Sequence, residues 1–227
     1  EVLGWLINNY VFDKYKNKKD TQAYLVQPKI IDANRVLKFA EAEALARNLI
    51  NTPTSDMGPE DLASAVKNLA NKFDAEYSEI VGEKLIQQNF PLIHAVGRAS
   101  AQEPRLLEIK NGSAGPKVTL VGKGVCFDTG GLNIKPGRSM GLMKKDMGGA
   151  ANVLALASMI LSTGMIIQLR VLIPAVENSI SENSFRPGDI LTARNGSTVE
   201  INNTDTEGRL VLADALSFAS EDSPDLI

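Results

Sequence analysis

The chain has 227 residues, of which 44% are hydrophobic and 22% are charged, and its formal net charge is −3. This balance is typical of a globular protein with a core, and the acidic sum argues against a broad basic surface for nucleic acid or anionic membranes. The single cysteine, Cys126, excludes an intrachain disulfide, and the single histidine, His94, excludes metal sites that need two imidazoles. A catalytic metal would therefore need mainly carboxylate ligands.

The N-terminal residues hold one short apolar stretch before a polar, lysine-rich segment. Apolar side chains at Leu3, Trp5 and Leu6 predict a short helix followed by a linker. We expect residues 1–30 to be the end of an upstream accessory domain with a linker helix, and residues 31–227 to form an α/β domain that lacks its C-terminal part. The first residues do not have the layout of a signal peptide.

Two amphipathic helices and two strands are predicted next. Apolar residues recur on one side of a helix from about Ala33 to Ile50. A break follows, and Pro59 suits the first turn of a second helix. The apolar runs Leu106–Ile109 and Val118–Val121 predict strands.

The uncharged stretch from Met147 to Leu169 has the length of a membrane-spanning helix. Gly164 and several polar residues interrupt it, so a buried helix, a turn and a strand at Gln168–Ile173 are favoured. Strands at Ile190–Arg194 and Thr198–Ile201 flank Asn-Gly, which predicts a hairpin with a two-residue turn.

A last helix is predicted to start near Arg209, and Leu226 and Ile227 to begin another strand. Strands therefore alternate with helices along the chain. This order predicts the α/β class, with a mixed, largely parallel sheet sandwiched between helices.

Two glycine-rich segments, residues 121–151 and 202–210, hold four acids among small and apolar neighbours: Asp128, Asp146, Asp205 and Glu207. In an extended stretch, the spacing of Asp205 and Glu207 would point both side chains the same way. If all four converge, their mutual repulsion requires protons or cations, and two divalent ions would balance the charge. Oxygen ligands suit Mg²⁺ or Mn²⁺ and are compatible with Zn²⁺.

Each of these residues also has an ordinary structural explanation. Asp146 could cap a helix, the acids near residue 206 could favour a helix start, and Lys123 and Lys135 could be surface lysines. The glycines could cradle a phosphate, although no complete phosphate-binding motif is present. A nucleophile pair of Cys126 with His94 is disfavoured, because nothing places them together.

Three segments resemble the signature blocks of the leucyl (cytosol) aminopeptidase family: VGKGVCFDTGGLNIKP at 121–136, MKKDMGGAA at 143–151 and NTDTEGRL at 203–210. The resemblance extends from about Tyr10 to the end of the chain. It implies that residues 31–227 are an incomplete catalytic α/β domain of the zinc-peptidase kind. Thr206 and Thr129 stand where the family has alanine and serine, and neither is a ligand position.

The resemblance implies a site that holds two divalent ions, Zn²⁺ or Mn²⁺ and alternatively Mg²⁺ or Co²⁺. The implied ligands are Lys123, Asp128, Asp146, Asp205 and Glu207. Lys135 and Arg209 would be the catalytic residues, with Arg209 holding a bicarbonate ion. Met143 would line the substrate pocket, and Lys135 and Asp146 would also contact the substrate.

The implied reaction is release of the N-terminal amino acid from peptides with a free N-terminus. A water bridging the metals would attack, Lys135 would stabilise the oxyanion, and the bicarbonate would act as base. The resemblance also implies a cytoplasmic homohexamer with no membrane segment. The alternatives are a DNA-binding or inactive peptidase-like hexamer subunit and a two-metal phosphatase; the acidic charge disfavours nucleic acid.

Overall fold

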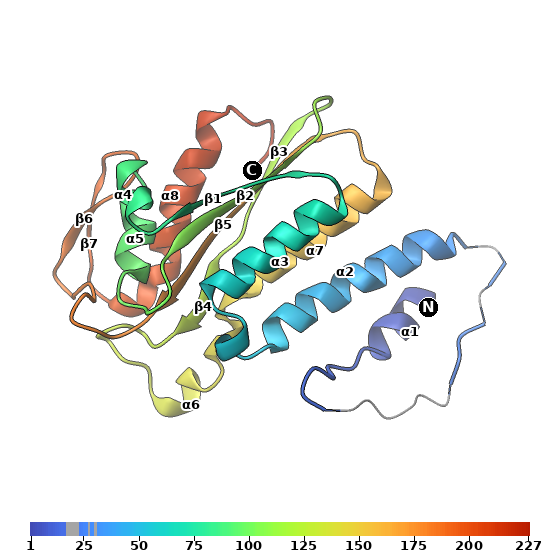
Figure 1. Ribbon diagram of the computed structural model, residues 1–227, viewed down its shortest axis with the longest axis horizontal. Coiled ribbons are helices and arrows are strands. Elements are labelled where there is room, and N and C mark those ends of the chain that lie inside the picture. Colours follow the sequence, from blue (N-terminus) through green and yellow to red (C-terminus); the bar gives the residue numbers. More distant parts are fainter. Residues whose placement is uncertain (17–22, 27, 30) are drawn as a thin grey trace.

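The computed structural model describes residues 1–16, 23–26, 28–29 and 31–227. One five-stranded sheet crosses the molecule, with helices on both of its faces (Figure 1). The helices are α1 (Val2–Asn8), α2 (Ala33–Asn51), α3 (Pro59–Lys72), α4 (Glu83–Gln87), α5 (Pro91–Gly97), α6 (Gly137–Met140), α7 (Gly148–Thr163) and α8 (Glu207–Glu221). Short 3-10 turns are η1 (Thr54–Asp56), η2 (Met143–Met147) and η3 (Thr204–Thr206).

The main sheet contains β1 (Glu76–Val81), β2 (Arg105–Asn111), β3 (Lys117–Val121), β4 (Gly124–Asp128) and β5 (Gln168–Asn178). Its order is β1-β2-β5-β3, and β4 also pairs with β5. Strands β3 and β4 run parallel to β5, whereas the β1–β2 and β2–β5 pairs are antiparallel. The predicted α/β class with a mixed sheet between helices is confirmed.

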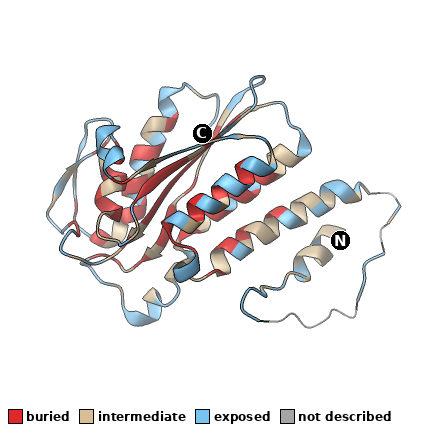
Figure 2. Ribbon diagram, viewed as in Figure 1, coloured by how far each residue is buried: buried red, intermediate tan, exposed pale blue. Residues whose placement is uncertain are grey.

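Alternating side chains of the central strand divide the core into two parts. Val171 and Ile173 of β5 pack with α2, α3 and α7, whereas Leu172 and Val176 pack with α4, α5 and α8. The buried residues follow these two layers (Figure 2). This period of two along β5 is the physical reason that helices cover both faces.

The predicted helices at Ala33–Ile50 and Pro59 are confirmed as α2 and α3. The stretch from Met147 divides into α7 and β5 as favoured, and none of the described helices has the length and hydropathy to cross a membrane. Leu226 forms a parallel bridge with Val118, in agreement with the start of a strand there.

The predicted hairpin is present as β6 (Ile190–Thr192) and β7 (Thr198–Glu200), but its two-residue turn is wrong. The amide N–H of Ala193 donates to the carbonyl of Ser197, so three residues form the connection. Gly196 supplies the positive φ, +85°, that this longer turn requires.

The N-terminal helix α1 packs on α2, where Arg47 donates to the Ile7 carbonyl and Tyr10 donates to Asn48. Residues 17–22, 27 and 30, which include most of the predicted linker, lie outside the described residues. The division of the chain near residue 30 therefore stays a prediction.

Strands β3 and β4 lie one after the other along the same side of β5, and Gly122 and Lys123 separate them. A Cβ atom on Gly122 would lie 2.8 Å from the Cα of Ala150, so only glycine lets the start of α7 pack so closely against the interruption. The Ala150 amide donates to the Lys123 carbonyl at 2.9 Å. This contact fixes the main chain of Lys123 between the end of β3 and the start of β4.

Candidate metal centre

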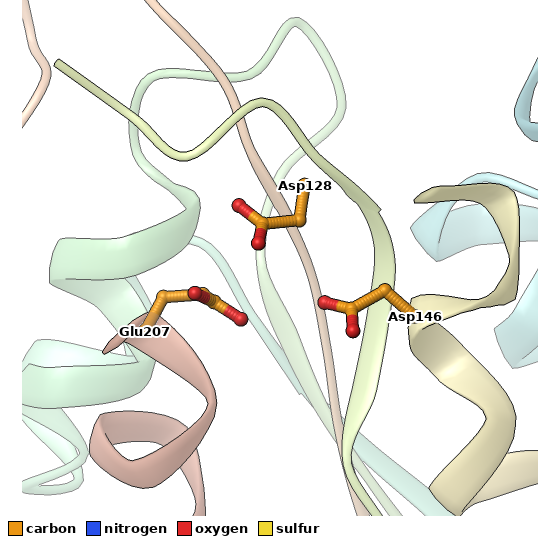
Figure 3. Close-up of side chains that lie close together, drawn as sticks. All are labelled: Asp128, Asp146 and Glu207. Atoms are coloured by element: carbon orange, nitrogen blue, oxygen red, sulfur yellow. The ribbon is translucent and has the colours of Figure 1, made fainter. Parts of the chain in front are cut away.

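Three carboxylates from distant parts of the chain meet at the carboxyl end of β4. Asp128 is the last residue of β4, Asp146 lies in η2, and Glu207 is the first residue of α8. Each offers an oxygen, and the three oxygens lie within 4.8 Å of one another. Figure 3 shows their carboxylates pointing toward a common space. Asp128 and Glu207 are each only 2% exposed, so this is not a solvated acidic surface.

Lys123 lies between two of these acids. Its Nζ is 2.7 Å from Asp146 Oδ2 and 2.8 Å from Glu207 Oε1. Its side chain passes directly over the second residue of α8, because a Cβ atom on Gly208 would lie 2.7 Å from Lys123 Cε. Glycine at 208 therefore provides the room that brings the Lys123 amine to Glu207.

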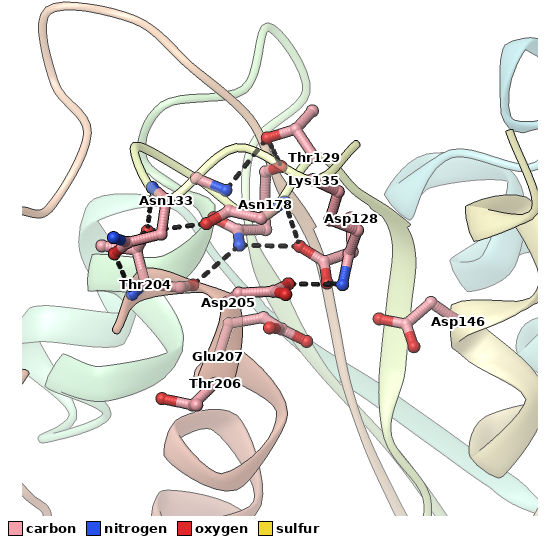
Figure 4. A network of polar contacts seen from close by, with 12 residues as sticks. Asp128, Thr129, Asn133, Lys135, Asp146, Asn178, Thr204, Asp205, Thr206 and Glu207 are labelled. Carbon is pink, nitrogen blue, oxygen red and sulfur yellow. Dashed lines mark hydrogen bonds and ion pairs between the residues drawn. The ribbon is translucent and has the colours of Figure 1, made fainter. Parts of the chain in front are cut away.

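Lys135 joins the remaining acid to the cluster. Its Nζ lies 2.9 Å from Asp128 Oδ2 and also pairs with Asp205 Oδ1, while its side chain is only 14% exposed. Apart from this ammonium, Asp205 Oδ1 has no hydrogen-bond donor among the described residues. The four acids and two lysines thus form one continuous network, drawn in part in Figure 4.

Sequence reasoning missed a set of polar residues behind this network. Asn178, at the end of β5, donates from Nδ2 to Asp128 Oδ1 at 2.8 Å and to the Thr204 carbonyl at 3.1 Å. The Thr204 hydroxyl donates to the Gly130 carbonyl and accepts from the Asn133 amide. A polar residue that ends a long apolar strand, as Asn178 does, is the sequence signal that could have indicated it.

The electrostatics of the site favour charged lysines. Burial lowers the pKa of Lys123, but its pairs with Asp146 and Glu207 outweigh this effect and raise the pKa above its usual value. The pKa of Lys135 is raised in the same way by Asp205 and Asp128. Both side chains are therefore ammonium ions in this arrangement.

The two buried acids respond differently to their surroundings. Burial alone would raise the pKa of Asp128, but Lys135, the Gly130 amide and Asn178 hold it below the usual range. For Glu207, burial prevails over the pairing with Lys123 and raises the pKa. A buried acid whose charge is only partly compensated is the kind of group that an additional cation would stabilise.

The donor set fits divalent cations. Four carboxylates face two ammonium groups, which leaves two negative charges uncompensated in the network. Lys123 already occupies the position of a shared cation between Asp146 and Glu207, and as a neutral amine it would become a nitrogen donor. Oxygen-rich donors with one nitrogen suit Mn²⁺, Zn²⁺ or Mg²⁺.

Two of the ordinary explanations do not hold. Asp146 does not cap α7, whose preceding residue is Met147 with no side-chain cap; Asp146 pairs with Lys123 instead. Lys123 and Lys135 are not surface lysines, since their side chains are only 25% and 14% exposed and both pair with acids of the site. Residues 205–207 are not extended: Asp205 lies in η3 and Glu207 begins α8, in agreement with the alternative that these acids favour a helix start.

The other predicted site residues lie outside the network. Arg209 is exposed on the first turn of α8 and makes no ion pair with a described residue, and Met143 is half-buried at the start of η2. Cys126 is buried in the core, and burial raises its pKa far above the usual value, so it is not an activated nucleophile. His94 contacts Glu83 at 3.3 Å.

Comparison with known proteins agrees with this geometry. Residues 44–227 match the catalytic domain of the cytosol aminopeptidase family. A probable cytosol aminopeptidase from Aquifex aeolicus is 42% identical over 234 residues, covering 99% of this chain and 47% of the relative. The chain therefore spans about half the length of such relatives.

Solved structures give the same result. A cytosol aminopeptidase from Coxiella burnetii has a TM-score of 0.95 and 49% identity, over 99% of this chain and 49% of that one. The bottromycin maturation enzyme BotP in complex with Mn has a TM-score of 0.88 and 35% identity, over 98% and 49% of the two chains. The match over most of its length shows that this chain belongs to the cytosol aminopeptidase family.

Proposed function

We propose that the protein is a metal-dependent aminopeptidase that releases the N-terminal residue of peptides. The observation that carries the proposal is the meeting of Asp128, Asp146 and Glu207 within 4.8 Å, in one network with Lys123 and Asp205. Family membership supports the same reaction.

Lys123, Asp128, Asp146, Asp205 and Glu207 would hold two divalent ions. When bound, such ions supply a water of lowered pKa and polarise the scissile carbonyl. The chain itself supplies a buried, preorganised set of donors, since oxygens of Asp128, Asp146 and Glu207 lie within 4.8 Å of one another and the burial of Asp128 and Glu207 excludes bulk water. Zn²⁺ or Mn²⁺ are the proposed ions, with Mg²⁺ and Co²⁺ as alternatives.

Lys135 would stabilise the developing oxyanion. Its raised pKa keeps the ammonium charged near neutral pH, and its pairs with Asp128 and Asp205 hold it at the edge of the acid cluster. Arg209, exposed in the first turn of α8 two residues after Glu207, would bind a bicarbonate ion, an anion that can serve as a general base.

The proposed substrates are peptides with a free N-terminus, since a free amine can ligate a metal and an internal peptide bond offers no such amine. Lys135 and Asp146 would contact the substrate. Met143 lies in η2 together with Asp146 and would line the pocket for the side chain of the substrate's first residue. We also propose a cytoplasmic homohexamer for the protein of natural length, which light scattering would test.

Leucine anilide is the substrate for the test, with the protein of natural length prepared by chelation and then supplied with Mn²⁺. Hydrolysis should depend on the added metal, and an N-acetylated leucine anilide should remain intact. Hydrolysis of a phenyl phosphate instead would favour the phosphatase alternative. Salt-sensitive retention of DNA without hydrolysis of the anilide would favour the DNA-binding alternative.

A further inference from the structure

We propose that Asn178 is a positioning residue for the metal centre. Its side-chain amide fixes the Asp128 carboxylate and the turn that carries Asp205 relative to each other, so that both acids face the same cations. The inference rests on the proposed metal-dependent function and concerns a residue that does not itself touch metal or substrate.

One amide group makes both connections. Nδ2 of Asn178 donates to Asp128 Oδ1 at 2.8 Å and to the carbonyl of Thr204, the residue before Asp205, at 3.1 Å (Figure 4). Asp128 Oδ1 also accepts from the Gly130 amide, so this oxygen is fully engaged. The carboxylate is thereby held with Oδ2 directed at Lys135, which in turn pairs with Asp205.

The orientation of the amide is fixed by its neighbours. Both groups that face Nδ2 are acceptors, so the reversed amide would set oxygen against oxygen. On the other side, a Cβ atom on Gly131 would lie 3.2 Å from Asn178 Oδ1, so the backbone of the loop closes over the amide. Asn178 is only 1% exposed, so its side chain is enclosed by the protein.

This arrangement lowers stability in one respect. Asn178 Oδ1 is buried and has no donor among the described residues, and an unpaired buried acceptor lowers the stability of the folded state. A sequence optimised for stability alone would place an apolar side chain here. Unpaired buried polar atoms are expected at functional sites, where a side chain is retained for the groups that it positions.

The side chain can be tested apart from the main chain. The Asn178 carbonyl accepts from the amide and the hydroxyl of Thr129, and its backbone pairs with β4. A substitution of the side chain leaves these main-chain contacts in place. Asn178→Leu keeps the number and branching of the side-chain heavy atoms and removes both the donor and the unpaired acceptor, whereas Asn178→Ala adds no new atom. Asn68→Ala, at an exposed position of α3, is the matched control.

The measurement is Mn²⁺ binding to the metal-free protein of natural length, by calorimetry and by electron paramagnetic resonance. We expect both Asn178 variants to bind Mn²⁺ about 10–100-fold more weakly than the wild type, the range for loss of a residue that orients a ligand. The signal of a magnetically coupled Mn²⁺ pair should weaken in favour of isolated ions. The value of kcat should fall while KM changes little, and Asn68→Ala should match the wild type.

The outcomes separate the two proposals. A wild type that binds no pair of Mn²⁺ ions would refute the proposed function and this inference with it. A wild type that binds the pair, with Asn178 variants that bind it equally well, would overturn this inference alone. Loss of the cooperative unfolding transition in both metal-free variants would assign Asn178 to the fold and would also overturn it.

Discussion

Gly208 offers a sharp test of how the candidate site is built, because the side chain of Lys123 occupies the space that a Cβ atom would need there. A Cβ atom at this position would lie 2.7 Å from Cε, 2.9 Å from Cδ and 2.9 Å from Nζ of Lys123. These atoms are the far end of a flexible side chain. The helix can therefore stay in place in Gly208→Ala, and Lys123 must move.

The expected energies have opposite signs. Replacing glycine by alanine inside a helix ordinarily stabilises by about 0.5–1 kcal/mol. Crowding at Lys123 costs about 1–3 kcal/mol and withdraws its ammonium from Asp146 and the buried Glu207. We expect the metal-free variant to be less stable than the wild type by about 0–2.5 kcal/mol, combining these terms. In a chain of 227 residues this lowers the midpoint of thermal unfolding by no more than about 10 °C.

Metal binding should change more than stability. With Lys123 displaced, we expect Mn²⁺ affinity to fall at least about ten-fold. The assays are thermal unfolding of the metal-free protein and calorimetric titration with Mn²⁺. Gly4→Ala in α1 is the control, since nothing lies within 4 Å of its added Cβ atom, and this variant should be neutral or slightly stabilised. A Gly208→Ala variant that binds Mn²⁺ with wild-type affinity and has a raised midpoint of thermal unfolding would refute the proposed crowding of Lys123.

Four further predictions concern single side chains. Glu207→Gln and Asp205→Asn should lower metal content and activity together, as measured by metal analysis and anilide hydrolysis; unchanged stoichiometry in either would count against their assignment as ligands. Lys135→Ala should lower kcat by about 100-fold or more with both metals still bound, and loss of metal would mean that its role is different. Asp214 accepts from the amides of Leu92, Ile93 and Arg194. Its removal in Asp214→Ala should therefore cost about 2–4 kcal/mol in urea unfolding, and a loss below that range would contradict the hydrogen-bond account. Burial raises the pKa of Asp214, so the folded state binds its proton at higher pH than the unfolded chain does. The stability of the wild type relative to Asp214→Asn should thus increase as pH falls through the folded-state pKa and be lost as pH rises through it; parallel stability curves would contradict the assignment.

Local patterns were sufficient for elements whose own residues carry the signal. The apolar stripe of α2, the proline at the start of α3 and the interrupted stretch that becomes α7 and β5 each follow from short-range rules. Strands β1 and β4 were not predicted. β1 is a largely exposed edge strand without alternation, and β4 is a short run bounded by Gly124 and Asp128. The hairpin was predicted with too short a turn, because cross-strand pairing selects the connection.

For the site, the sequence by itself determined the inventory: four acids, two lysines and the glycines between them, together with the family that they resemble. Only the tertiary structure decided that these groups meet. The reason is that residues 123, 128, 146 and 207 lie on different elements. The distances between them depend on the parallel pairing of β4 with β5 and on the packing of α7 and α8 on the two faces of the sheet. The role of Asn178 has the same origin, since its two acceptors lie far from it in sequence and reach it only through the sheet.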